Sequence, residues 1–176
     1  MYSLRSTLAE QPVISLQTGQ VVAQVTQPIL EVSNLEVIAF LCRVPQDKRP
    51  LLLICRDIRQ FAVDCIIVDD EDALTDPDDI VRIDTNLKNH YTPIGKPVID
   101  DSGRKLGTVE DYSVNLETNR VQQLYVRGSF LRALMGSNLI VDRTQITDIT
   151  PTHITVRDTA VTDPLMQDSL PETPLS

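Results

Sequence analysis

The 176-residue chain lacks most of the features that mark an enzyme or a membrane protein. No GxGxxG, GxxxxGK[ST], HExxH or GxSxG pattern occurs, so the common phosphate, dinucleotide, zinc-protease and hydrolase signatures are absent. The longest unbroken apolar runs, Val37–Cys42 and Leu51–Cys55, are much shorter than the roughly 20 residues that span a bilayer. We therefore expect a non-enzymatic protein with no catalytic residue, no cofactor and no membrane-spanning helix.

Cysteine and histidine are also scarce. The three cysteines, Cys42, Cys55 and Cys65, form no CxxC pair, so neither a zinc site nor a redox pair is indicated, and we expect reduced thiols. Cys42 and Cys65 are predicted to pack as small apolar residues, and Cys55 is predicted to be exposed. Of the two histidines, His90 and His153, the second precedes a predicted strand and is interpreted as a turn residue.

Two further absences concern location and charge. The N-terminal segment has no apolar stretch of about 7 to 15 residues, which a secretory signal requires, so the expected location is the cytoplasm. Basic residues are outnumbered, with 16 Lys and Arg against 25 Asp and Glu, which gives a net charge of −9. This balance opposes broad electrostatic attraction to nucleic acid or to anionic lipid.

What the sequence does contain is an internal repeat. Before a loop of variable length, the aligned positions are Pro12–Ile14 with Pro97–Ile99, and Val22, Val25, Val32, Val37 and Arg43 with Leu106, Val109, Leu116, Val121 and Arg127. After that loop, they are Leu52–Ile54 with Leu139–Val141, and Ile58, Phe61, Ile66 and Val68 with Ile146, Ile149, Ile154 and Val156. This alignment places Cys55 on Asp142. Duplication explains the matches more simply than coincidence.

Both copies consist of short β-rich runs in which apolar side chains recur at a period closer to 2 than to 3.6. In the second copy, the predicted strands are 97–100, 106–115, 120–127, 139–143, 146–150 and 153–157. Six short strands suit a small closed barrel, because closure removes exposed sheet edges. We predict an all-β fold of two tandem six-stranded barrels with separate cores, a first half (residues 1–89) and a second half (residues 90–162), followed by a flexible tail (163–176).

Turn residues punctuate the predicted strands. Gly19 and Gly103 can adopt the positive φ that a tight hairpin needs, and Asn34 and Asn119 tolerate the left-handed conformation at the next turn. The segment Asp100-Asp101-Ser102-Gly103 is accordingly interpreted as a turn rather than as a metal site.

An acidic segment, Asp69–Asp79, joins the two halves. Asp76 and Pro77 resemble the N-cap and first residue of a helix, predicted over 77–88, in which Ile80, Ile83 and Leu87 share one face. Clustered carboxylates can attract calcium or a basic partner, but these lack the spacing of a calcium-binding loop. We therefore favour a solvated linker and a helix cap, with no metal site.

The turn glycines and aliphatic positions resemble those of the PRC-barrel superfamily. The resemblance is strongest over Gly95–Asp111 and Val121–Gly128, and weaker over Pro12–Val22. PRC-type barrels occur in reaction-centre H subunits, in the C-terminal domain of a ribosome maturation factor and in stand-alone proteins. The resemblance implies two PRC-type β-barrels that dock on larger assemblies, and its shared positions include no catalytic residue.

The two copies differ most in one loop, where residues 128–138 replace 44–50. The candidate partner-binding residues of this loop are Phe130, Leu131, Arg132, Leu134 and Met135. Apolar loop residues on a rigid scaffold often bind partners, but they can also plug the end of a small barrel and so extend its core. The sequence alone favours the plug for these side chains and keeps the docking patch as the alternative.

Three functions are compatible with these patterns. The first is a protein-docking adaptor, and the second is an RNA- or ribosome-associated maturation factor that uses the second half. The second half carries 8 basic and 8 acidic residues, whereas the first carries 8 and 14. The basic residues that could form a phosphate-binding patch are Arg104, Lys105, Arg120, Arg127, Arg132 and Arg143. An enzyme or a small-ligand binder is the third hypothesis.

Overall fold

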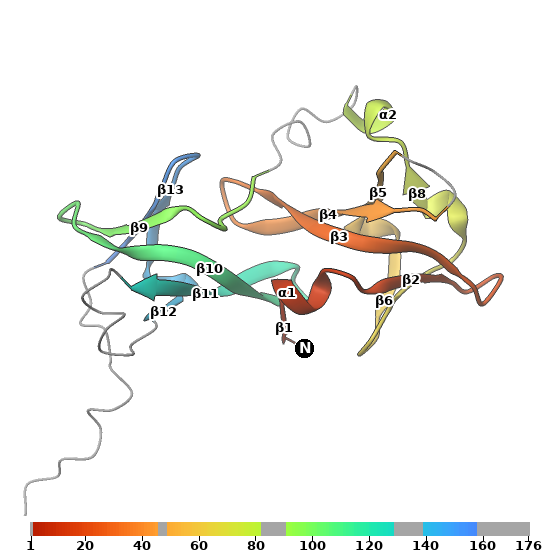
Figure 1. The fold of residues 1–176 in the computed structure, drawn as a ribbon, viewed down its shortest axis with the longest axis horizontal. Helices are drawn as coiled ribbons and strands as arrows, with labels where there is room; N and C mark the ends of the chain where they lie inside the picture. Colours follow the sequence, from red (N-terminus) through yellow and green to blue (C-terminus); the bar gives the residue numbers. More distant parts are fainter. Residues whose placement is uncertain (1, 46–48, 82–90, 129–138, 158–176) are drawn as a thin grey trace, which may run out of the picture.

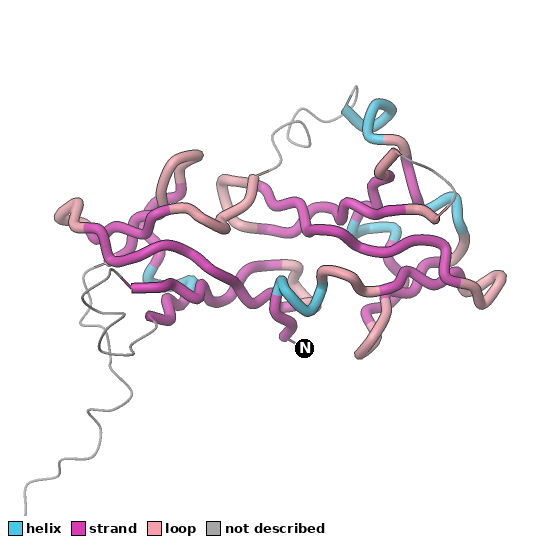
Figure 2. Tube along the Cα trace, viewed as in Figure 1, coloured by secondary structure: helices cyan, strands magenta, loops and turns pink. Residues whose placement is uncertain are grey.

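Curled β-sheet makes up most of the molecule, and its two halves lie at opposite ends of an elongated body (Figures 1 and 2). The structure, a computed structural model, describes residues 2–45, 49–81, 91–128 and 139–157. The helical elements are short: α1 (Arg5–Leu8), α2 (Pro77–Val81), η1 (Cys55–Asp57), η2 (Glu71–Ala73) and η4 (Arg143–Gln145). None of the described helices is long and apolar enough to cross a membrane. The all-β prediction is confirmed.

The second half contains the six predicted strands, with ends within one residue of the predicted ones. They are β9 (Pro97–Asp100), β10 (Lys105–Asn115), β11 (Arg120–Gly128), β12 (Leu139–Asp142), β13 (Ile146–Ile149) and β14 (Ile154–Val156). Their order in the sheet is β13-β14-β9-β10-β11-β12, with β9 and β14 parallel and the other neighbours antiparallel. Burial alternates along β9, β12 and β14, so that one face of each of these strands lies on the core, which is the pattern that a period of 2 predicts.

The first half has the same strand order. Its strands are β2 (Pro12–Ser15), β3 (Val21–Glu31), β4 (Glu36–Arg43), β5 (Leu51–Ile54), β6 (Ile58–Phe61) and β7 (Ile66–Val68). They follow the order β6-β7-β2-β3-β4-β5, again with one parallel pair, β2 and β7. A seventh strand, β8 (Leu74–Thr75), is added to the outer edge of β5.

The predicted alignment of β5 with β12 is wrong by one residue. Ile54 pairs with Ala39 of β4, and Asp142 pairs with the corresponding residue of β11, Gln123. Ile54 is therefore equivalent to Asp142, and Cys55 is equivalent to Arg143 rather than to Asp142. The error arose because β5 lies in a continuous apolar run, in which no alternation fixes the register.

The prediction of two separate cores is also wrong. Glu36 at the start of β4 pairs with Arg120 at the start of β11, and this pairing joins both halves into one 14-stranded sheet. The buried side chains form one continuous cluster that draws on both halves, including Phe40 and Ile66 from the first and Tyr112 and Ile154 from the second. The molecule therefore behaves as one packed body rather than as two linked units.

Neither half is closed by a continuous hydrogen-bond ladder within the described residues. β12 pairs with β11, and β13 pairs with β14, but no pairing joins β12 to β13. The same holds for β5 and β6 of the first half. Each half is thus a curled sheet with a gap in its wall, which corrects the expectation of full closure.

The N-terminal segment crosses between the halves, a feature that the sequence did not indicate. β1 (Tyr2–Leu4) pairs antiparallel with β10 of the second half, and α1 follows it with Leu8 fully buried in the shared core. The hydroxyl of Ser6 donates a hydrogen bond to Asp111 Oδ2 at 2.6 Å. The chain then enters β2 of the first half, so its first residues fasten one half to the other.

Most turn predictions are confirmed. Gly19 and Gly103 have φ values of 68° and 82°, and Asn119 is left-handed with a φ of 54°. In the first half, however, the left-handed residue is Leu35, with a φ of 53°, because Asn34 instead accepts the Glu36 N–H through its side-chain oxygen at 2.8 Å.

The helix predicted over 77–88 begins where expected. Asp76 Oδ1 accepts the backbone N–H of Asp78 at 2.9 Å, and α2 starts at Pro77. Residues 82–90 lie outside the described part of the chain, and so do residues 163–176, for which a flexible tail was predicted.

Gly107→Ala is expected to destabilise the protein. A Cβ at Gly107 would lie 2.1 Å from the carbonyl oxygen of Arg127, and a backbone oxygen cannot swing aside as a side chain can. Overpacking of this kind costs about 1–3 kcal/mol, which urea-induced unfolding would measure. The equivalent residue of the first half is Ala23, so Ala23→Gly is the matched control and should cost about 1 kcal/mol or less. An unchanged free energy of unfolding in Gly107→Ala would contradict the close approach of Gly107 to the backbone of Arg127.

Candidate functional site

The predicted partner-binding residues, Phe130, Leu131, Arg132, Leu134 and Met135, lie outside the described residues. The structure fixes the two ends of their loop. β11 ends at Gly128 and β12 begins at Leu139, at one end of the second half. The assignment of these residues to docking or to a barrel plug therefore stays a prediction.

The described part of the chain contains a junction with approximate twofold symmetry. The Val37 N–H donates to the Asn119 carbonyl oxygen at 2.6 Å, and the Val121 N–H donates to the Leu35 carbonyl oxygen at 3.1 Å. Leu35 corresponds to Asn119, and Val37 corresponds to Val121. Each hydrogen bond therefore becomes the other when the two halves are interchanged. Such reciprocity is the signature of an interface between two copies of one surface. The duplicated halves thus meet as the subunits of a symmetric dimer do.

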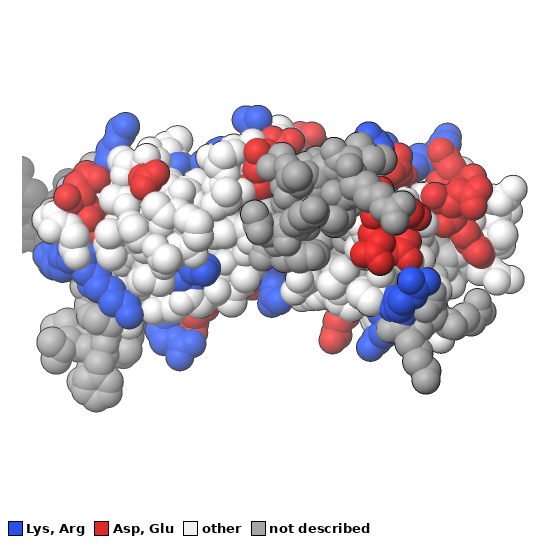
Figure 3. Space-filling model, turned by 90° about the horizontal axis from the view of Figure 1, so that it is seen from above, with Lys and Arg blue, Asp and Glu red and all other residues white. Residues whose placement is uncertain are grey.

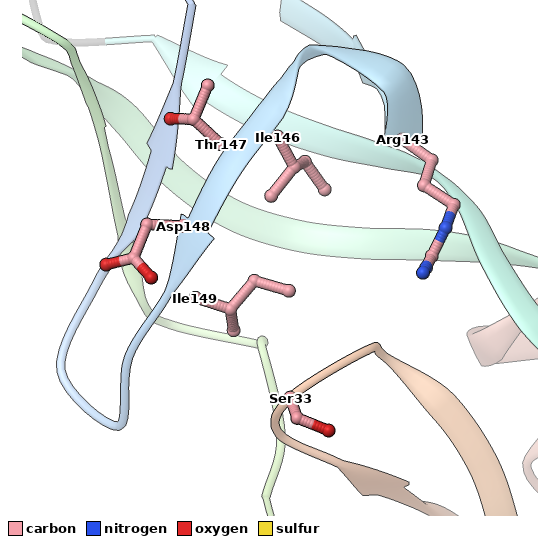
Figure 4. Close-up of a pocket in the computed structure, with 6 residues that line it drawn as sticks. All are labelled: Ser33, Arg143, Ile146, Thr147, Asp148 and Ile149. Atoms are coloured by element: carbon pink, nitrogen blue, oxygen red, sulfur yellow. The ribbon is translucent and has the colours of Figure 1, made fainter.

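A pocket of about 510 Å³ lies on one side of this junction (Figure 4). The side chains of Ile146 and Ile149 point from β13 into the space that Ser33 of the first half faces, and Arg143 extends toward that space. Thr147 and Asp148 of β13 also line the pocket. The wall gap between β12 and β13 is thus bordered by a turn of the opposite half.

An equivalent pocket of about 410 Å³ lies on the other side. It is lined by Cys55, Ile58, Arg59, Gln60 and Phe61 of the first half, and by Leu116, Glu117 and Asn119 of the second. Leu116 is 8% exposed and belongs to the shared core, and Phe61 packs against that core. Each half therefore contributes its β-turn to the open wall of the other, as the symmetry requires.

Cys55 and Arg143 occupy equivalent positions in the two pockets. The Cys55 thiol donates to the Val37 carbonyl oxygen at 3.1 Å, and Arg143 Nη1 donates to the Val121 carbonyl oxygen at 3.4 Å. Burial, and to a smaller extent the charge of Glu36, raises the pKa of Cys55 to about 12, so the group is a protonated thiol at neutral pH. One position thus carries an unreactive thiol in one half and a cation in the other.

Arg143 gives the larger pocket its electrostatic character. Burial is the main cause that lowers the pKa of Arg143, and the nearby Arg120 adds to it, while Glu36 acts in the opposite direction. An arginine remains charged under such perturbation, because its unperturbed pKa is far above neutrality. The pocket therefore combines two isoleucines with polar side chains, among them the half-buried cation of Arg143 and the carboxylate of Asp148.

The cysteine predictions are confirmed in part. Cys42 is fully buried, and burial raises the pKa of its thiol to about 12, in keeping with a packing role. Cys65 is half-buried, and all three thiols are free. The prediction that Cys55 is exposed is wrong, because its true equivalent is Arg143 at the junction.

The segment at Asp100 is a turn, as predicted. Asp100 is buried, and its carboxylate accepts hydrogen bonds from the Ser102 hydroxyl at 2.5 Å, the Arg104 N–H at 2.9 Å and Arg104 Nε at 2.8 Å. Chiefly the Ser102 hydroxyl, and then Arg104, lower the pKa of Asp100 to about 2 against the opposing effect of burial. The carboxylate therefore stabilises the hairpin turn.

His153 also lies in a turn, between β13 and β14. Its Nδ1 lies 3.1 Å from Thr150 Oγ1, and the Thr150 hydroxyl accepts the His153 backbone N–H at 3.0 Å. Within the described residues, no group of three or more histidine, cysteine or acidic side chains is arranged to hold a metal ion.

The charged side chains are distributed unevenly (Figure 3). Seen from above, acidic groups gather mainly over the first half, while basic groups border the far end of the second. Several arginines that were candidates for a phosphate-binding patch contact carboxylates. The pairs are Arg104 with Asp100, Arg120 with Glu36, and Arg127 with Glu110. Arg132 lies outside the described residues. A phosphate group would therefore compete with a neighbouring carboxylate for each of these three arginines.

Comparison with known proteins places a family domain in the second half. Residues 86–162 match the model of the PRC-barrel domain family, and this segment includes all six strands from β9 to β14. The match supports the resemblance of the chain to the PRC-barrel superfamily. No curated protein matches the chain.

Leu35→Gly is expected to lower the free energy of unfolding. The left-handed backbone of Leu35 costs about 1–2 kcal/mol, which glycine would relieve. Truncation of a fully buried leucine costs about 2–5 kcal/mol, so the lost packing outweighs the relief. Urea-induced unfolding would measure the difference. Asn119→Gly at the equivalent position should leave stability nearly unchanged, and a more stable Leu35→Gly would show that core packing does not hold this turn.

The contribution of Asp100 to stability is expected to vanish in acid. The carboxylate has a pKa of about 2 in the folded state, below its usual value of 3.8, so its contribution is complete above about pH 4 and is lost as the pH falls toward 2. The stability difference between wild type and Asp100→Asn should therefore be constant near neutral pH and shrink across this acidic range. Thermal unfolding over a pH series would measure it. Asp64→Asn, which removes an exposed carboxylate, should show no comparable trend.

Proposed function

We propose that the protein is a non-enzymatic docking adaptor built from two PRC-type halves. The family match of residues 86–162 supports this for the second half. For the first half, the support is the shared strand order and register of β2–β7 and β9–β14. The resemblance to a superfamily of assembly modules favours binding of another protein.

The observation that carries the proposal is the continuous core across the junction. Because the buried residues of both halves form one cluster, loops at the two ends of the molecule are held on a common scaffold. Binding residues are often found on loops that a rigid scaffold positions. Segments 44–50 and 128–138 connect equivalent pairs of strands but differ in length and in sequence, so we expect them to recognise different partners or parts of a partner.

Three described side chains of types that often act in catalysis make structural contacts instead. The Cys55 thiol is protonated and donates to a backbone carbonyl, and Asp100 is saturated by donors in a turn. His153 is engaged with its own turn through Thr150. These assignments support an adaptor over an enzyme.

Binding of RNA or a ribosome is the weaker alternative. Three of the basic residues on which it relies, Arg104, Arg120 and Arg127, are paired with carboxylates. A phosphate-driven contact would have to break these pairs in a chain of net charge −9.

A double substitution, Phe130→Ser with Leu134→Ser, is expected to abolish capture of the partner. Cross-linking in cells, followed by affinity purification and quantitative mass spectrometry, would compare the variant with wild type. The matched control is Leu16→Ser with Val63→Ser, which removes two apolar side chains that are 56% and 72% exposed elsewhere on the surface. Thermal unfolding would be measured on all three proteins. Loss of capture at unchanged stability supports docking, whereas a large fall in melting temperature with capture retained would identify the loop as a barrel plug.

A further inference from the structure

Within the described residues, no strand covers the outer edge of β12, whereas β8 covers the same edge in the first half. There, β8 pairs antiparallel with β5 and places Leu74 opposite Leu53 and Thr75 opposite Leu52. β12 has the same register on β11 that β5 has on β4, yet among the described segments no strand pairs with its second edge. A sheet edge of this kind can accept a further strand through its backbone groups.

Side-chain exposure also differs between β12 and β5. Ile140 of β12 is equivalent to Leu52 of β5, since each occupies the second position of its strand and pairs with an equivalent residue of the neighbouring strand. Leu52 is 1% exposed, whereas Ile140 is 52% exposed. Leu52 packs in a small apolar cluster with Ile29 and Ala39, whereas the residues equivalent to these two, Ser113 and Gln123, are polar. The outer face of β12 therefore carries a large aliphatic side chain without apolar neighbours of the kind that bury its counterpart.

The sequence contains a second copy of the covering segment. Ala73-Leu74-Thr75-Asp76-Pro77 forms β8, the cap of α2 and its first residue. Ala160-Val161-Thr162-Asp163-Pro164 repeats it, with four of the five residues identical and valine in place of leucine. The copy follows β14 as the original follows β7, with a connection one residue shorter. Residues 158–176 lie outside the described part of the chain.

We propose that residues 160–162 form an antiparallel strand on the outer edge of β12. By equivalence with β8, Val161 lies opposite Val141 and Thr162 lies opposite Ile140. The edge of β12 is thus an acceptor for an extended peptide with an apolar residue followed by Thr-Asp-Pro, and its occupant is the chain's own C-terminal segment. This inference does not rest on the proposed docking function.

Cross-linking of the full-length protein tests the pairing directly. The double variant Ile140→Cys/Thr162→Cys is expected to form an intramolecular disulfide under mild oxidation, because directly opposed residues of antiparallel strands bring their Cβ atoms close together. Peptide mapping by mass spectrometry would detect it. Leu52→Cys/Thr75→Cys is the positive control, since these residues are opposed in the structure. Ile140→Cys/Ser169→Cys is the negative control, because it keeps the cysteine on β12 and places the second cysteine elsewhere in the same C-terminal segment.

Two outcomes would overturn the proposal. Equal cross-linking yields for Thr162→Cys and Ser169→Cys would mean that residues 160–162 have no preferred place on β12. A covalent dimer formed by Ile140→Cys alone, detected on a non-reducing gel, would mean that a second copy of the chain occupies the edge.

Hydrogen–deuterium exchange provides an independent measurement on proteins without added cysteine. Thr162→Pro removes a backbone N–H and the conformational freedom that a paired strand needs, so amides of residues 139–142 are expected to lose protection. Ser169→Pro is the matched control in the same tail and should leave these amides unchanged. Equal protection in both variants would contradict the pairing, whatever the outcome of the docking experiment.

Discussion

The two reciprocal hydrogen bonds between the starts of β4 and β11 hold the rest of the structure in its arrangement. They join Val37 to Asn119 and Val121 to Leu35, and so they fix the rotation of one half relative to the other. With that rotation fixed, the turn of each half borders the gap in the wall of the other, and both sets of inward side chains merge into one core. A relatively small hydrogen-bonded contact thereby determines where a much larger apolar surface is buried.

Several polar side chains make hydrogen bonds within the turns and at the junction. These side chains are therefore not available to react with a substrate. The buried carboxylate of Asp100 accepts hydrogen bonds from residues of its own hairpin, and the Cys55 thiol donates a hydrogen bond to a backbone carbonyl of β4. The half-buried Arg143 is the exception, because it places a positive charge in a pocket that Ile146 and Ile149 also line. A scaffold with these properties is suited to presenting loops and sheet edges, in keeping with the docking function proposed above.

Local patterns predicted the strands well because each carries its own signal. The second half was located from alternating aliphatic residues and from turn residues such as Gly103 and Asn119, and the family match of residues 86–162 covers the same segment. The register of β5 was missed because Leu51–Cys55 is apolar throughout. The junction was missed because pairing between Glu36 and Arg120 joins residues far apart in the sequence, and neither residue differs locally from an ordinary surface charge.

Local sequence patterns predicted the candidate site only in part. The equivalence of Cys55 and Arg143 could be recognised only once the strand pairing had set the register. The left-handed conformation of Leu35 had no local signal either, because leucine adopts it only where the surrounding packing compensates for the backbone strain.

Residues of opposite charge occupy equivalent positions at the centre of the junction, and this difference affects how the two halves recognise each other. At equivalent positions, one half carries Glu36 and the other carries Arg120, and the two side chains approach to 3.4 Å. If two copies of the same half met through this surface, a carboxylate would oppose a carboxylate, or a guanidinium would oppose a guanidinium. Divergence after duplication has therefore made each half a poor match for itself and a good match for the other half, which favours pairing of unlike halves over pairing of two first halves or of two second halves.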